Sequence, residues 1–211
     1  MGNLLGHVGF YDFSELAGSR YETFFDSIDG WTIDKPVAGV VNMGGGQVNI
    51  QGGIDVGDYA ELQKFMSFGH WSPSFNKKRL LRSMIEFAFK AGGDEDNYFW
   101  TGDKPDWGQG FGFIFKSDRI QAYARNETEI TYVNLITGLS PPWTEAYLLD
   151  ALFRPGVRIE FRVDGIWKAN ISTTLPLGDD TSAMPLAFRV GKGNIIAHNM
   201  SFSSALFFQD T

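Results

Sequence analysis

The chain has 211 residues, of which 43% are hydrophobic and 15% aromatic, and its formal net charge is −7. This acidic balance argues against a nucleic-acid partner, because phosphate binding needs clustered lysine and arginine. The sequence contains no cysteine, which excludes disulfides and thiolate metal sites, so burial must supply the stability. The 19 phenylalanines and 25 glycines favour many short strands separated by turns. We therefore expect one all-β domain over residues 1–211.

The N-terminal stretch MGNLLGHVGFYDFSEL lacks the basic start and the continuous apolar core of a signal peptide. No run in the sequence approaches the length of a membrane span. We therefore expect no membrane partner, and a cytoplasmic location unless the protein is built into a larger particle.

Alternating apolar residues, together with aromatic and β-branched runs, predict about eleven strands. In chain order they lie near residues 20–26, 38–51, 58–68, 79–91, 109–116, 119–125, 129–135, 157–163, 166–173, 184–190 and 194–208. The segment TEAYLLDALF, residues 144–153, is the one candidate helix, because prolines flank it on both sides. The spacing of the turns is typical of a sandwich or barrel and not of alternating strands and helices.

The segment RIEFRVDGIWKANIS, residues 158–172, predicts a hairpin that turns at Asp164 and Gly165. A two-residue turn would pair Phe161 with a lysine and mix apolar and polar residues on both faces. A three-residue loop that begins one residue earlier, with Gly165 in the left-handed conformation and a bulge, pairs Phe161 with Trp167 instead. Burial at about 25 cal/mol per Å² outweighs turn preference, so we predict the bulged loop, with Trp167 on the core face.

The segment AGGDEDNYFWTGDKPDWGQG, residues 91–110, interleaves acidic and aromatic side chains. Sugar sites use aromatic rings against the apolar face of a pyranose and short polar side chains against its hydroxyls. The candidate ligand-binding residues are Asn97, Tyr98, Trp100, Asp103, Asp106 and Trp107. In the competing interpretation, to which we give more weight, the two tryptophans pack the loop onto the domain while the acids stay solvated. Oxygen ligands also suit calcium, but the spacing does not match an EF-hand loop, so we expect no cofactor and keep calcium as an alternative.

The sequence FRPGVRIEFRVDGIWKANISTTLP, residues 153–176, resembles the strand, V-D-G, strand, T-x-L-P segment of concanavalin A-like lectin/glucanase domains, which include laminin-G-like modules. The segment GFGFIFKSDRIQAYARNETE is similar to their preceding meander, and PLAFRVG followed by NIIAHNMSFSSALFFQ is similar to their closing strands. The similarity covers roughly residues 80–209. It implies an all-β fold, a two-sheet antiparallel β-sandwich of the concanavalin A-like jelly-roll type.

Some families with this fold cleave polysaccharides with two or three acids on one strand, commonly spaced E-x-D-x-x-E or E-x-D-x-E. The sequence contains no such triplet, and Asp164 is assigned to a turn, away from Glu160. A glycan-cleaving hydrolase would therefore need a constellation built from distant loops, and we expect no enzymatic activity.

Three functions remain, in order of preference. The first is a non-catalytic structural or interaction module on the surface of a virus particle, such as a capsid decoration or tail component, with other protein subunits as partners. This preference rests on the resemblance, because phage structural proteins often carry such domains. The second is a soluble carbohydrate-binding, lectin-like protein with glycan partners. The third is a glycan-cleaving hydrolase.

Overall fold

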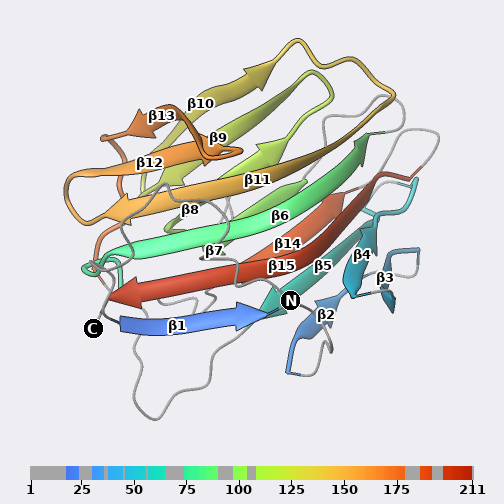
Figure 1. The fold of residues 1–211 in the computed structure, drawn as a ribbon, viewed down its shortest axis with the longest axis horizontal. Helices are drawn as coiled ribbons and strands as arrows, with labels where there is room; N and C mark the ends of the chain where they lie inside the picture. Colours follow the sequence, from blue (N-terminus) through green and yellow to red (C-terminus); the bar gives the residue numbers. More distant parts are fainter. Residues whose placement is uncertain are drawn as a thin grey trace.

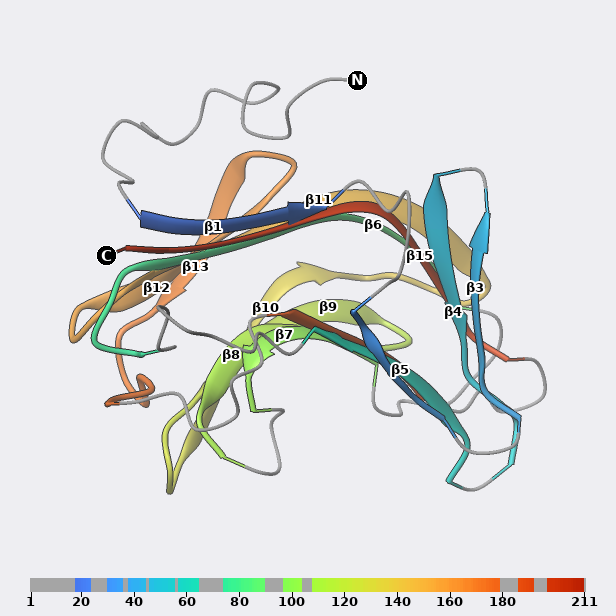
Figure 2. The same cartoon turned by 90° about the horizontal axis from the view of Figure 1, so that it is seen from below.

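The computed structural model describes residues 18–23, 30–35, 38–44, 46–55, 57–64, 74–89, 97–103, 108–178, 186–191 and 197–210. Within these ranges the chain forms fifteen strands in two antiparallel sheets (Figure 1). Figure 2 shows the two sheets stacked as two layers, so the fold is an all-β, two-sheet antiparallel sandwich, as predicted. None of the described residues forms a helix that is long and apolar enough to cross a membrane.

The first sheet has eight strands. Seven follow each other in the spatial order β13 (Ile166–Ile171), β12 (Arg158–Val163), β11 (Trp143–Arg154), β6 (Arg79–Phe89), β15 (Asn199–Asp210), β4 (Gln47–Gln51) and β3 (Val40–Gly44). The eighth strand, β1 (Gly18–Thr23), pairs with residues 205–210 of β15, whereas β4 pairs with residues 199–202 of the same strand. The long strand β15 therefore carries two shorter strands along its outer edge.

The second sheet has seven strands. Their spatial order is β10 (Ile130–Thr137), β9 (Arg119–Arg125), β8 (Gly110–Phe115), β7 (Tyr98–Gly102), β14 (Leu186–Gly191), β5 (Tyr59–Lys64) and β2 (Thr32–Asp34). The consecutive strands β7 to β10 form a meander, which the sequence predicted only from β8 onward. Strand β7 lies inside the segment that was expected to be a loop.

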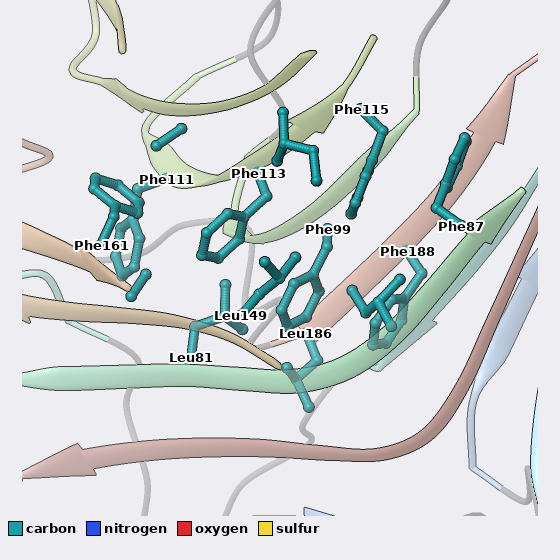
Figure 3. Packing of buried hydrophobic residues seen from close by; sticks show 14 of the residues in the cluster. Leu81, Phe87, Phe99, Phe111, Phe113, Phe115, Leu149, Phe161, Leu186 and Phe188 are labelled. Carbon is teal, nitrogen blue, oxygen red and sulfur yellow. The ribbon is translucent and has the colours of Figure 1, made fainter. Parts of the chain in front are cut away.

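The core between the sheets consists largely of phenylalanine rings, which point toward one another from both layers (Figure 3). The rings of Phe188 and Phe202 stack with centroids 3.8 Å apart, and those of Phe99 and Phe188 with centroids 4.8 Å apart. Each pair lies within or near the range in which offset aromatic rings attract each other beyond simple burial. Phe99 and Phe188 are neighbours in the second sheet, whereas Phe202 belongs to the first sheet, so the stack of Phe188 on Phe202 joins the two sheets.

The segment predicted as a helix, residues 144–153, is instead part of the long strand β11, between β6 and β12. Its two faces are both covered: Leu149, Ala151 and Phe153 lie in the core, and Leu148 and Leu152 are buried on the opposite face. A central strand that is buried on both faces shows no period-two alternation, so its apolar run is hard to distinguish from a buried helix.

The hairpin between β12 and β13 turns at Asp164 and Gly165, whose φ angles are +53° and +75°. The predicted positive φ of Gly165 is therefore confirmed. However, both central residues are left-handed, which is the pattern of a two-residue type I′ turn and not of the predicted three-residue loop. The carboxylate of Asp164 also accepts a hydrogen bond from the backbone nitrogen of Leu148, at 2.9 Å, which ties the turn to β11.

The predicted pairing of this hairpin is wrong, because its bulge lies inside β13 and not in the turn. Phe161 pairs with Ala169, and Arg162 pairs with Trp167, with a shift of register between them. This internal bulge still brings the apolar residues of the two strands together, so the core face is complete. It also turns Trp167 away from the core, and 56% of its surface is exposed.

Candidate ligand-binding site

A cleft of about 320 Å³ opens where three connecting segments of the sandwich meet. These segments are the end of the connection from β7 to β8, the turn between β9 and β10, and the chain that follows β13. The described residues that line it are Gln109, Asn126, Glu127, Thr128, Leu177 and Gly178. We call this the Gln109 cleft.

One wall of the Gln109 cleft is the turn between β9 and β10, which Asn126 organises. Its side-chain oxygen accepts hydrogen bonds from the backbone nitrogens of Thr128 and Glu129, at 2.9 and 2.8 Å. It also lies 3.2 Å from the Thr128 hydroxyl, which donates to it. Such an Asx turn fixes the local backbone. It therefore holds the exposed side chains of Glu127 and Thr128 at the rim of the cleft.

The opposite wall is the chain that follows β13, with Leu177 and Gly178, and Gln109 joins it to the first wall. The side-chain oxygen of Gln109 accepts a hydrogen bond of 2.6 Å from the backbone nitrogen of Leu177, 68 residues later in the chain. Its amide nitrogen lies 3.5 Å from a carboxylate oxygen of Glu127. Leu177 has 58% of its surface exposed beside these polar groups. The cleft thus places an apolar surface next to amide, carboxylate and hydroxyl groups.

This combination suits one face of a sugar ring. A pyranose has an apolar face of C–H groups and a rim of hydroxyls that donate and accept hydrogen bonds. Leu177 can contact the apolar face of the ring. The polar groups of Gln109, Glu127 and Thr128 can form hydrogen bonds with its hydroxyls. Ligand sites of this kind combine apolar lining with a few placed polar groups.

The four described candidate residues of the 91–110 segment do not form one open site. Asn97 is fully buried, where its side chain donates to the backbone oxygen of Phe115 at 3.3 Å and accepts from the backbone nitrogen of Gly191 at 3.1 Å. It thus connects the ends of β8 and β14. Asp103 is half-buried and accepts, through its backbone oxygen, a hydrogen bond from the Tyr123 hydroxyl at 3.3 Å. Asp106 and Trp107 lie outside the described residues.

Trp100 and Tyr98 lie on β7 and not on a loop, and both side chains are buried. They pack with Ile114, Tyr123 and Ala187 in a second apolar cluster, on the face of the sheet opposite the main core. The indole nitrogen of Trp100 donates a hydrogen bond of 3.1 Å to the backbone oxygen of Gly102. No ring face of Trp100 is therefore open to a sugar.

Of the described residues that line the Gln109 cleft, Gln109 alone belongs to a segment that the sequence analysis named as a candidate. Gln109 stands at the end of the 91–110 segment, but Glu127, Thr128 and Leu177 were not expected to join it. The Asn-Glu-Thr sequence signals a turn, because asparagine favours turns. Nothing local shows that this turn meets a residue some 50 positions away.

Among the described residues, no group of three or more histidine, aspartate or glutamate side chains is placed to hold a metal ion. Glu160 makes ion pairs with Arg154 and Arg158, at 3.2 and 2.8 Å. His198 is fully buried, with its ring centroid 4.1 Å from that of Phe89.

No family model matches the sequence, and no curated protein matches it in sequence comparison. Solved structures do share the fold. A carbohydrate esterase from the Shiga toxin-encoding bacteriophage phi24B matches with a TM-score of 0.60 and 11% identity, over 93% of this chain and 100% of that one.

Two botulinum neurotoxin structures also match. One is of type C, whose cell entry depends on interaction with two ganglioside molecules; its TM-score is 0.56 at 10% identity, over 84% of this chain and 43% of that one. The other is the binding domain of type DC in complex with rat synaptotagmin II, with a TM-score of 0.56 at 9% identity, over 84% of this chain and 42% of that one. The chain thus spans less than half of these toxin chains. At such low identity, the likeness shows the fold alone.

Proposed function

We propose that this protein is a non-catalytic carbohydrate-binding module of the concanavalin A-like lectin kind, and that the Gln109 cleft is its binding site. The observation that carries this proposal is the exposed Leu177 beside Gln109, Glu127 and Thr128. The comparison supports it indirectly, because the neurotoxin of type C interacts with gangliosides and the phage protein is described as a carbohydrate esterase.

The geometry predicts weak, hydroxyl-directed binding. The Glu127 carboxylate would accept hydrogen bonds from two sugar hydroxyls, and a hydrogen bond to a charged group contributes about 1.5–3 kcal/mol. The amide nitrogen of Gln109 would donate to another hydroxyl, exchanging its long contact of 3.5 Å with Glu127 for a better one. Leu177 would cover the apolar face of the ring. This binding needs no metal, so we propose that the protein has no cofactor.

The test is direct binding to a broad glycan array, followed by titration of each hit. Glu127→Ala should weaken the binding of a cleft ligand about tenfold, which corresponds to roughly 1.4 kcal/mol. The matched control is Glu129→Ala, an exposed acid of the same turn that does not line the cleft, and it should leave the affinity unchanged. If no glycan binds, or if Glu127→Ala binds as well as the original protein, this assignment of the cleft fails.

The non-catalytic part of the proposal has its own test. The purified protein should release neither reducing ends from β-glucans nor acetate from O-acetylated saccharides. Glu160 makes ion pairs with two arginines, which supports a structural role for it. Release of either product in proportion to protein concentration would show that the protein is an enzyme.

We also propose that the module works on the surface of a virus particle, as a capsid decoration or tail component in contact with other protein subunits. The support is the similarity of the fold, over 93% of this chain, to a phage-encoded protein, together with the sequence resemblance to domains found in phage structural proteins. A protein outside such a particle would then be cytoplasmic. Antibodies against the purified protein should label intact particles in electron micrographs, and particles without label would contradict this location.

A further inference from the structure

The strand β10 lies at an open edge of the second sheet. Among the described strands it pairs only with β9, and Figure 1 shows it along the upper rim of the sandwich. In an antiparallel ladder, successive residues direct their backbone N–H and C=O groups to opposite sides of the strand, so about half of these groups in β10 point away from β9. Such a row of donors and acceptors is a template for pairing with another strand.

The sequence of β10 lacks the features that usually protect an edge. Residues 130–137 read ITYVNLIT and contain no charged residue, proline or glycine. Edge strands are normally short or carry charges that hinder pairing with another chain. Among the described edge strands, β1, β2 and β13 each contain a charged residue, and β3 has five residues against eight in β10. The strand β10 is thus the longest of these edges, and it carries no charge.

Apolar side chains line both faces of this edge. On the outer face, Ile130 packs against the second apolar cluster, and Tyr132 has 48% of its surface exposed. On the core face, Val133 and Ile136 pack against the main core but are only partly buried. A strand added beside β10 would cover these side chains further, and the burial of their apolar surface would favour its binding.

A bulge limits where a second strand fits. The register of β10 on β9 is regular over residues 130–134 and shifts after them. The chain that follows β13 also approaches this strand, with the Thr173 hydroxyl 3.4 Å from that of Thr131. Thr131 pairs with the core residue Ala124, so this contact is made on the core face and not in the plane of the sheet. The regular stretch, which has Tyr132 at its midpoint, is therefore where a second strand can pair.

The two ends of β10 differ in charge. The turn before it, residues 126–129, contains two exposed glutamates and no base. At its other end Thr137 pairs with Arg119, and the adjoining residues 116–119 contain two bases and one acid. An antiparallel copy of the strand would bring its acidic end beside the basic end of the first, whereas a parallel copy would bring the glutamates together. This complementarity is a balance of charge over each turn, so it does not require an unpaired side chain.

We propose that two copies of this chain associate through β10, with the two strands antiparallel about a two-fold axis at Tyr132. Tyr132 of one copy then faces Tyr132 of the other on the outer face, and Thr131 faces Val133 on the core face. The second sheets of the two copies become one continuous sheet. A second copy fits this edge because a two-fold interface must be self-complementary, as the charges at the two ends of β10 are. The inference concerns the sheet edge and does not depend on the function proposed for the Gln109 cleft.

Sedimentation velocity measures this association in the purified protein. We expect a reversible dimer with a dissociation constant on the order of 10–100 µM, because a short strand pair buries less than the ~1,200 Å² of total surface found in stable interfaces. Tyr132→Lys places two ammonium groups opposite each other and should raise this constant at least about tenfold. The matched controls are Tyr132→Phe, which is uncharged, and Ile54→Lys, which adds the same charge at another exposed position. Both should leave the constant within about threefold of the original value.

The cysteine-free sequence permits a direct test of the register. Facing residues of antiparallel strands have Cβ atoms about 4.5–5.5 Å apart, so a short bismaleimide should cross-link Tyr132→Cys into a covalent dimer. The exposed Ile54→Cys should remain monomeric under the same conditions. Glu129→Lys and Arg119→Glu should each weaken dimerisation, and the double variant should restore it, because antiparallel pairing brings these two ends together.

Three outcomes would overturn the proposal. The first is a dimer that Tyr132→Lys does not weaken or that Tyr132→Cys does not cross-link, which would place the interface elsewhere. The second is a monomer at every concentration in which all amides of residues 130–134 are protected from hydrogen exchange, which would show that the chain itself covers the edge. The third is a monomer that binds a different protein subunit and loses this binding in Tyr132→Lys, which would assign the edge to another partner.

Discussion

Replacing Trp100 by alanine decides whether this residue is part of the core or part of a binding surface. The sequence names it as a candidate stacking residue for a sugar, with packing onto the domain as the preferred interpretation, and the structure buries it completely on β7. It packs with Tyr98, whose ring centroid lies 6.1 Å away in an edge-to-face arrangement, and with Ile114 and Tyr123. Its indole nitrogen also donates to the backbone oxygen of Gly102.

The size of the effect follows from this environment. Truncating a buried tryptophan to alanine removes its burial and leaves a cavity, at a combined cost of about 3–5 kcal/mol. Since the free energy of unfolding of a domain is commonly about 5–15 kcal/mol, this loss would be a large part of the total stability. For a chain of this length, 1 kcal/mol lowers the melting temperature by roughly 2–4 °C, so a fall of about 6–20 °C is expected.

Urea denaturation followed by circular dichroism measures this loss, with Trp167→Ala as the control. The control removes the same side chain from an exposed position and should change the free energy of unfolding by no more than about 0.5 kcal/mol. If Trp100→Ala instead unfolded within about 1 kcal/mol of the original protein while sugar binding was lost, the burial of Trp100 would be refuted.

Three further predictions concern the backbone, the buried charges and metal ions. Gly165→Ala should destabilise by about 1 kcal/mol or more, because φ is +75° there, whereas Gly44→Ala, with no atom within 4 Å of the added carbon, should be close to neutral in the same denaturation assay. Arg82→Leu should destabilise by about 3–5 kcal/mol, because it leaves the buried carboxylate of Asp150 without its partner. Burial raises the pKa of Asp150 and loss of Arg82 raises it further, so the stability of this variant should fall more steeply than that of the original protein as the pH rises from about 4 to 7; parallel curves would contradict this. Treatment with EDTA should leave the denaturation midpoint unchanged, and a midpoint that falls and then recovers with calcium would reveal a metal site.

The sequence was most informative for strands that have one face in the core and a more exposed face on the other side. The strands over residues 79–91 and 109–116 were placed correctly to within a few residues, although the second is buried on both faces. The strands over residues 119–125 and 129–135, whose two faces differ in burial, were placed equally well. In such strands the alternation of side chains is a local property of the extended backbone, so a short window of sequence contains it. The content of phenylalanine and glycine likewise predicted the all-β class without any knowledge of which strands pair.

The sequence was misleading where the environment of a segment depends on distant parts of the chain. Residues 144–153 suggested a helix because both faces of β11 are covered, which removes the alternation that marks a strand. The 98–102 segment suggested a loop because acids and glycines surround it, although β8 and β14 pair with it on both sides. In both cases neighbouring strands decide the structure, and they come from elsewhere in the sequence.

The exposure of the tryptophans shows most clearly what only the tertiary structure decided. The sequence allowed Trp100 to be either a sugar contact or a packing residue, with more weight on packing, and it placed Trp167 in the core; the structure buries Trp100 and exposes Trp167. For Trp167 the cause is a single bulge in β13, opposite Phe161 and Arg162, since one residue of shift exchanges the two faces of a strand. The Gln109 cleft has the same origin, because it joins segments 68 residues apart that no local pattern connects. Composition and alternation determine which residues favour burial, but the pairing of strands in the sheets determines which of them are buried.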